Sequence, residues 1–136
     1  MTALYRPGTR WQELLEVSPD LEALGIRVDQ PLREAQSRVP PARYLALDEP
    51  IQTAIEADFA AVLEALEAFS PVVEPAPRED LGAGRALAYV DVAGLGPLYG
   101  TEPEIARRLA EAAGAAGGGA ACVGIAGGKF TAWVAA

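Results

Sequence analysis

The sequence contains no histidine, and Cys122 is its single cysteine. A disulfide within the chain and a zinc site of Cys and His ligands are therefore excluded, because each needs at least two such side chains. Catalysis with histidine as the acid or base is excluded as well. Cys122 lies in the apolar run ACVGIA, and we predict that it is buried as core filling.

Long hydrophobic runs are also missing. The N-terminal segment MTALYRPGTR has no apolar run after its basic residues, as a secretory signal would have. No stretch approaches the roughly 18 apolar residues that suggest a membrane span. We therefore expect a cytoplasmic protein without a membrane segment.

Positive charge is scarce. Eleven Lys and Arg residues face nineteen Asp and Glu residues, which gives a formal net charge of −8. Neutralising a nucleic-acid backbone needs clustered Lys and Arg, and Arg107–Arg108 is the single adjacent pair. Any contact with DNA is therefore expected to be local or to come from parts of the protein outside this chain.

The remaining composition is that of a soluble globular protein. With 136 residues, of which 51% are hydrophobic and 22% charged, the chain is long enough to bury a core without a metal or disulfide. One α/β domain spanning residues 1–136 is the expectation.

Capping and proline signals predict the elements of the first third. Residues 10–17 suit a short strand or a helix, and we favour the strand. Ser18, Glu22 and Gly25 suggest an N-cap, a capping box and a C-terminal glycine around a short helix that begins at Pro19. A second helix is predicted from Pro31 to the prolines at 40 and 41, followed by a strand over 44–47.

The rest of the chain shows clearer patterns. Apolar residues at three- and four-residue steps predict a long helix over 50–70. Residues 72–74 and 86–92 suit two strands of a hairpin, since the prolines and glycines between them interrupt regular structure. Thr101 and Glu104 predict a capped helix over 103–113. A buried strand at ACVGIA and a helix at KFTAWVAA should follow.

Three stretches resemble, in order and spacing, the finger and palm regions of Y-family (translesion) DNA polymerases. They are LGIRVDQPLREAQSRVP, FSPVVEP with the later AYVDVAGLGPLYG, and CVGIAGGKFTAWVAA. The resemblance implies a ferredoxin-like palm over about residues 48–136 and a small helical finger segment over about residues 10–47. The thumb and little finger of that family are absent from the chain.

The resemblance also implies where metal-binding residues would lie. Y-family polymerases hold two Mg²⁺ ions with acidic side chains, and one of these side chains lies on an N-terminal strand. The N-terminal segment MTALYRPGTR has no acidic residue. We expect that strand to be lost. Counting back from Ala88 and Tyr89 places Ala86 and Leu87 at the other acidic pair; an alternative alignment places Glu79 and Asp80 there. We predict no metal site, with Mg²⁺ needed only if the protein is catalytic.

The triphosphate positions are kept in part. The family's finger Tyr and Arg fall on Pro19 and Glu22, and a carboxylate there would repel phosphate. Lys129 matches a phosphate-contacting lysine of the family, the alternative being an ordinary exposed lysine at a helix start.

Three further residues have structural interpretations. A lone Asp91 suits a hairpin or cap residue. Phe130 and Trp133, three apart on a helix, are expected to pack into the core.

Three functions remain open at the level of sequence. The first is a non-catalytic, polymerase-like accessory protein of DNA repair, translesion synthesis and the SOS response, similar to the inactive ImuB-like members of the family. Its partners would be DNA or DNA-repair proteins, engaged through parts absent here, and it would need no cofactor. The second is a fragment of an active DNA-directed DNA polymerase, in which Glu79, Asp80 and Lys129 would matter. The third is a small α/β association module unrelated to polymerases.

Overall fold

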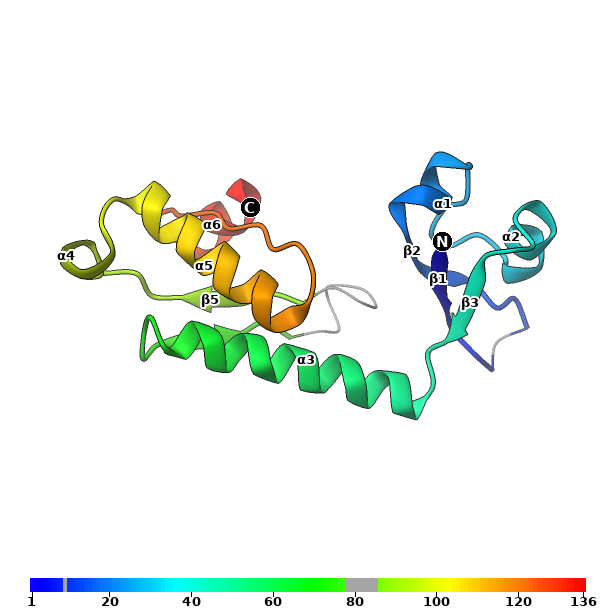
Figure 1. Ribbon diagram of the computed structural model, residues 1–136, viewed down its shortest axis with the longest axis horizontal. Coiled ribbons are helices and arrows are strands. Elements are labelled where there is room, and N and C mark those ends of the chain that lie inside the picture. The colour runs from blue at the N-terminus through cyan, green and yellow to red at the C-terminus, as the bar shows by residue number, and fades with distance from the viewer. Residues whose placement is uncertain (9, 78–85) are drawn as a thin grey trace. The chain divides into compact units, whose positions relative to one another are not determined.

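The computed structural model, drawn in Figure 1, describes residues 1–8, 10–77 and 86–136. Its described residues fall into two units, the first within Met1–Ile55 and the second made of Glu56–Pro77 and Ala86–Ala136. The single domain expected from the length of the chain stays a prediction. Among these described ranges, no helix is both long and apolar enough to cross a membrane.

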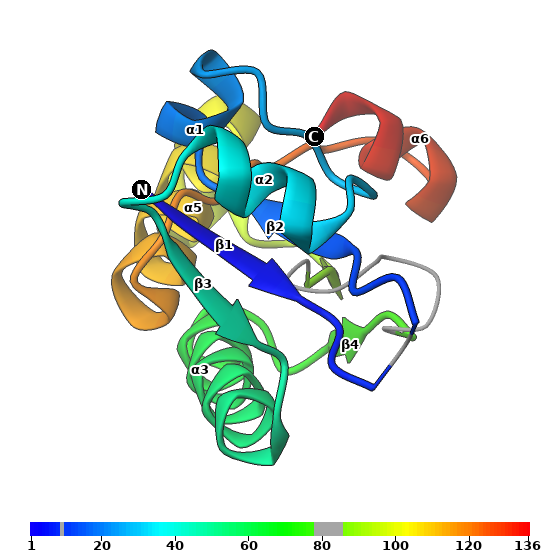
Figure 2. The ribbon, with the colours of Figure 1, turned by 90° about the vertical axis from the view of Figure 1, so that its right-hand side faces the viewer.

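The first unit is built on a three-stranded sheet of order β2-β1-β3. Strand β1 (Thr2–Tyr5) pairs antiparallel with β2 (Leu14–Val17) and parallel with β3 (Arg43–Ala46). Figure 2 shows β1 and β3 side by side. The strands expected near residues 10–17 and 44–47 are confirmed.

The expectation that the N-terminal strand is lost is wrong, because β1 forms there. Its four residues TALY are too few for their alternation to predict a strand, and β1 is held by its two neighbours. The N-terminal segment thus supplies the central strand of the sheet, although no acidic side chain lies on it.

Two short helices cover the sheet of the first unit through one apolar core. They are α1 (Pro19–Ala23) and α2 (Leu32–Arg38), both near their predicted positions. The Tyr44 hydroxyl donates hydrogen bonds to the carbonyls of Ala35 at 2.8 Å and Val39 at 3.1 Å, which fastens α2 to β3. The core side chains are all apolar and less than a tenth exposed: Ala3, Leu14, Leu21, Ile26, Leu32, Ala35 and Val39.

The start of α1 differs from its prediction in one respect. No side-chain cap forms at Ser18; its Oγ instead accepts a hydrogen bond of 2.9 Å from the Thr2 amide. A capping box needs the acidic residue three positions after the cap, where Leu21 stands, whereas Glu22 lies one position too far. Gly25 ends the helix as predicted, with a φ of +84° that favours glycine.

The second unit combines helices with a two-stranded sheet. Helix α3 (Glu49–Glu67) confirms the long helix, and most of it belongs to this unit. Strands β4 (Val73–Pro75) and β5 (Ala88–Val90) pair antiparallel, as the hairpin prediction required. Helices α4 (Gly96–Tyr99), α5 (Glu102–Gly117) and α6 (Lys129–Ala135) follow.

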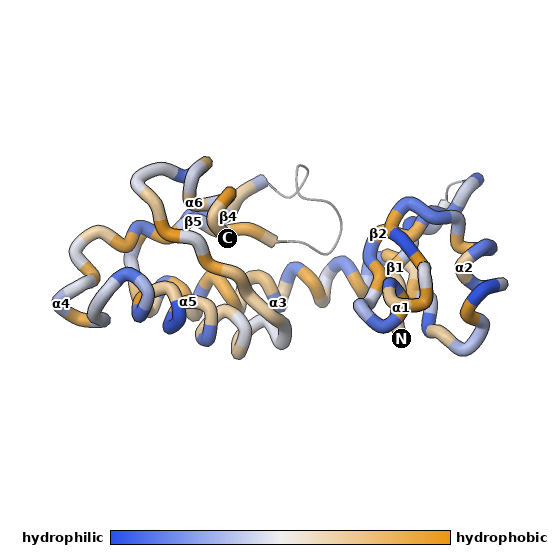
Figure 3. Tube along the Cα trace, turned by 90° about the horizontal axis from the view of Figure 1, so that it is seen from above, coloured by the Kyte–Doolittle hydropathy of each residue, from blue (hydrophilic) through white to orange (hydrophobic). Residues whose placement is uncertain are grey.

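The core of this unit lies between the hairpin and the helices. Apolar and hydrophilic residues alternate along α5 in Figure 3, as expected of a helix with one buried side. The buried members of the cluster come from α3, α5 and the turn after β5: Leu66, Leu95, Ile105 and Leu109. Partly buried Val73, Ala88 and Val90 of the hairpin pack against them.

Helix α5 begins with the capping box that its sequence predicted. The Glu104 carboxylate accepts hydrogen bonds from the Thr101 amide at 2.7 Å and from the Thr101 hydroxyl at 2.8 Å. The hydrogen bond from the Thr101 amide is the main cause that holds the pKa of Glu104 below its ordinary value of 4.5. This start fixes the direction of α5, and with it the positions of Ile105 and Leu109.

Three predictions for the C-terminal segment are wrong. ACVGIA forms no strand, although Val123 and Ile125 pack against the core, because its backbone finds no ladder partner among the described residues. Cys122 is exposed rather than buried. Phe130 and Trp133 are 73% and 51% exposed, and they contact each other at 6.1 Å between ring centroids.

A close approach of two backbone segments explains the path of ACVGIA. A Cβ atom added to Gly124 would overlap the Ala132 carbonyl oxygen and lie 2.6 Å from the Ala136 nitrogen. Only glycine fits here without displacing α6.

Replacing Gly124 with alanine should therefore destabilise the protein by about 1–3 kcal/mol, since the backbone of α6 has to move away. Urea unfolding followed by circular dichroism measures this loss. Gly127→Ala is the matched control because nothing lies within 4 Å of its added Cβ. Its stability should change by no more than about 0.5 kcal/mol. Equal effects of the two substitutions would contradict the close approach.

The lowered pKa of Glu104 predicts an acid-sensitive contribution to stability. A carboxyl whose folded-state pKa is depressed stabilises the protein above its unfolded-state pKa, and that contribution is lost as the pH falls through the folded-state value. Glu104→Gln keeps hydrogen-bonding capacity but does not titrate. The urea midpoint of this variant should fall less than that of the wild type between about pH 5 and pH 3. An identical fall in both proteins would contradict the role of the carboxylate.

Candidate functional site

Lys129, the lysine predicted to contact phosphate, lies at the first position of α6. Its Nζ atom is 2.6 Å from Oε2 of Glu74 on β4, and it also lies 5.2 Å from the ring centroid of Tyr89 on β5. Glu74 and Tyr89 are direct partners in the antiparallel register of the hairpin. The structure therefore brings one predicted site residue together with two residues that were not predicted.

The pleat of the hairpin explains this grouping. Successive side chains of a strand point to opposite faces, and paired residues share a face. Val73 and Val90 are partners whose side chains pack against the core, so the next pair, Glu74 and Tyr89, lies on the other face. Lys129 reaches that face from the start of α6.

These contacts contribute little free energy, but they compensate the positive charge of Lys129. The Lys129 and Glu74 side chains are 57% and 61% exposed, and ion pairs of that exposure contribute about 0.2–1 kcal/mol. An exposed cation–π contact adds about 0.5–1 kcal/mol. The ammonium group is thus already compensated by a carboxylate, and a phosphate would have to compete with Glu74 for it.

Acidic side chains near the hairpin do not form a metal site in the described residues. Glu74 is paired with Lys129, and Asp91 Oδ1 accepts a hydrogen bond of 2.9 Å from the Ala93 amide, as a turn residue does. Within residues 1–8, 10–77 and 86–136, no group of three or more His, Cys, Asp or Glu residues could hold a metal ion. These residues do not fit the two Mg²⁺ ions of a polymerase centre. Glu79 and Asp80 lie outside the described residues.

The two finger positions assigned to triphosphate contact lie on α1, where they serve the helix. Pro19 is at its first turn, and the Glu22 carbonyl accepts a hydrogen bond of 2.7 Å from Arg27 Nη1. The Arg27 guanidinium also donates to the Ile26 carbonyl at 3.0 Å. This arginine therefore closes the turn after α1.

Sequence reasoning missed the roles of Glu74 and Tyr89. The alternation in VVEP and AYV could have placed both on the outer face of the hairpin. No sequence signal showed that α6 would start beside that face, because this depends on the path of residues 118–128.

Comparison with known proteins identifies the fold. A model of the impB/mucB/samB family matches residues 3–136. The crystal structure of DinB from Sulfolobus solfataricus matches 98% of this chain with 20% identity and a TM-score of 0.72. An insertion ternary complex of Dbh DNA polymerase matches 98% of this chain with 20% identity and a TM-score of 0.74. A post-insertion binary complex of Dbh DNA polymerase matches 98% of this chain with 18% identity and a TM-score of 0.73. A search of curated protein sequences finds no match.

The chain spans 36% of the DinB chain and 37% of the Dbh chain in the ternary complex. The expected mixed α/β architecture is confirmed as that of the palm region of Y-family polymerases. Membership in this family also removes the alternative of an association module unrelated to polymerases. Because the family model covers nearly the whole sequence, the chain belongs to the impB/mucB/samB family and has the fold of part of a Y-family DNA polymerase.

Proposed function

We propose that this chain is a non-catalytic, polymerase-like domain that serves DNA repair as a scaffold rather than by nucleotide transfer. The observation that carries the proposal is the pairing of Lys129 with Glu74 on the outer face of the hairpin. A family lysine that would contact phosphate is held by a carboxylate, and the described residues around it offer no set of metal ligands.

The charge of the chain also supports the scaffold role. Its net charge of −8 opposes binding to a phosphate backbone. The proposal keeps a finger-like segment over about residues 10–47 and a palm-like region over about residues 48–136. DNA and DNA-repair proteins would be engaged through parts of a longer protein.

The second candidate is a fragment of an active DNA-directed DNA polymerase. One observation favours it, namely that Lys129 starts a helix, where a phosphate could also meet free backbone amides. In that case Glu79 and Asp80 would supply metal ligands and Mg²⁺ would be required.

Calorimetric titration with a deoxynucleoside triphosphate and Mg²⁺ separates the two candidates. We expect no saturable binding by the wild-type chain up to millimolar nucleotide, because Lys129 is paired with Glu74 and the described residues offer no set of metal ligands. Lys129→Ala and the double substitution Glu79→Gln with Asp80→Asn should then change nothing. Mg²⁺-dependent binding that both variants abolish would overturn the proposal in favour of the polymerase fragment.

Glu74→Gln should raise the affinity of the chain for inorganic pyrophosphate by about two- to fivefold at low salt. The variant frees the Lys129 ammonium from an exposed ion pair, and such a pair is worth at most about 1 kcal/mol. Glu67→Gln at the end of α3 changes the net charge equally and is the control. If both variants bind pyrophosphate equally, net charge rather than the freed lysine is responsible.

A further inference from the structure

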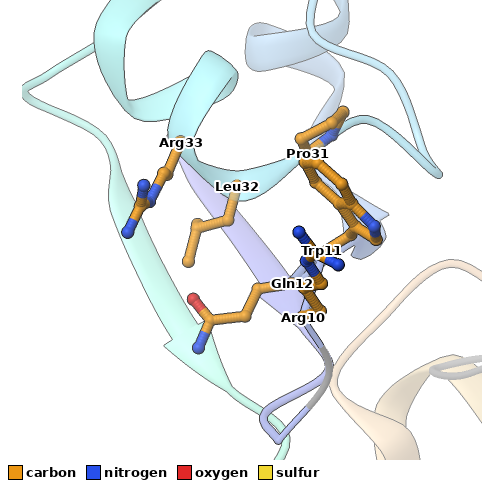
Figure 4. A pocket seen from close by; sticks show the side chains of 6 residues that line it. All are labelled: Arg10, Trp11, Gln12, Pro31, Leu32 and Arg33. Carbon is orange, nitrogen blue, oxygen red and sulfur yellow. The ribbon is translucent and has the colours of Figure 1, made fainter.

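A pocket in the first unit is not accounted for by the proposed function. Residues 10–12 form one wall, and Pro31, Leu32 and Arg33 at the start of α2 form the other. Its volume is about 270 Å³. Figure 4 shows its six lining side chains, with Leu32 between Arg33 and Gln12.

Backbone hydrogen bonds hold the two walls together. The Leu32 amide donates to the Gln12 carbonyl at 2.7 Å, and the Leu14 amide donates to the Gln30 carbonyl at 3.0 Å. Leu32 is 5% exposed and belongs to the core of the unit. The backbone of the two segments is therefore held in place, and Leu32 anchors the pocket to the core of the unit.

The rim of the pocket combines an exposed aromatic ring with two guanidinium groups. Trp11 is 64% exposed, and the guanidinium carbon of Arg10 lies 5.5 Å from the centroid of its ring. Arg33 stands on the opposite wall. Within the described part of the chain, neither arginine forms an ion pair, and no acidic residue lines the pocket.

We propose that this pocket docks an acidic peptide segment of a partner protein. An apolar side chain of the peptide would lie against Leu32 and Trp11, and its carboxylates would bind Arg10 and Arg33. Guanidinium groups bind carboxylates in a planar, bidentate geometry, and tryptophan and arginine are the residues that most often dominate protein interfaces. Charge complementarity acts locally, because the field of a distant acidic residue is screened within about 10 Å at moderate salt.

The pocket suits a peptide better than a nucleic acid. Its volume of about 270 Å³ lies below the ~300–1,000 Å³ of pockets that enclose drug-sized ligands, yet it is sufficient for an apolar side chain. Binding along a nucleic-acid strand needs a groove with several cations, and this pocket offers two. One face of the Trp11 ring is also occupied by Arg10, which hinders stacking of a base.

Fluorescence anisotropy with a labelled acidic hexapeptide, DDELED, tests the proposal on the whole 136-residue chain at about 0.1 M salt, where distant charges are screened. We expect saturable binding that weakens at least about fivefold in Arg33→Glu and in Trp11→Ala, since each removes one part of the rim. Replacing the peptide leucine with serine should weaken binding in the wild type. Arg43→Glu on β3 carries the same charge change at a residue that does not line the pocket, and this variant should bind as the wild type does.

Several outcomes would overturn the proposal. They are the absence of saturable peptide binding, an equal loss in Arg33→Glu and Arg43→Glu, or binding of a twelve-residue oligothymidylate in place of the peptide. Thermal unfolding is compared for all variants, and retained melting temperatures are expected because the substituted side chains lie at the surface. If a variant unfolds, adding unlabelled peptide to the wild type while following the Trp11 indole signal by NMR decides the question. An unchanged signal rejects the site.

Discussion

Burial of one face of the β4–β5 hairpin determines the chemistry of the other. Val73 and Val90 pack against the core of α3 and α5, so the alternation of the strands sends Glu74 and Tyr89 to the opposite side. A shift of the register by one residue would exchange the two sets and place a carboxylate against the apolar cluster. Because that is costly, the outer pair is fixed, and Lys129 meets a carboxylate there.

This pairing already engages the charge of Lys129. Its Nζ donates a hydrogen bond of 2.6 Å to Glu74. The nearby Asp91 is engaged by the Ala93 amide, so it too has a structural partner. The charges of Lys129, Glu74 and Asp91 are therefore all engaged by partners within the protein itself.

The sequence predicted those elements whose signals lie between neighbouring residues, and it failed where an element depends on distant partners. The long helix, the Thr101–Glu104 cap and the hairpin strands depend on neighbours in sequence, and they were predicted well. Strand β1 was missed because its four residues are defined by their partners. The ACVGIA strand was wrong because an apolar run can pack as irregular chain when a backbone passes as closely as α6 passes Gly124.

The site was predicted only in part for the same reason. Lys129 was found through a family pattern, but its contact with Glu74 joins residues 55 positions apart in the sequence. Such a pairing depends on the tertiary path and not on a motif. The rim of Arg10 and Arg33 was likewise missed, since it forms only when the start of α2 bonds to residue 12.

The central claim is that the outer face of the hairpin carries an internal ion pair and, among the residues that the structure describes, no metal centre. NMR of the ¹⁵N-labelled chain during a titration with Mn²⁺, which broadens nearby amide signals, tests it directly. The account predicts weak broadening spread over the acidic surface, with no saturation at micromolar Mn²⁺. Selective, saturable loss of the amide signals of Glu74, Tyr89 and Asp91 would contradict it.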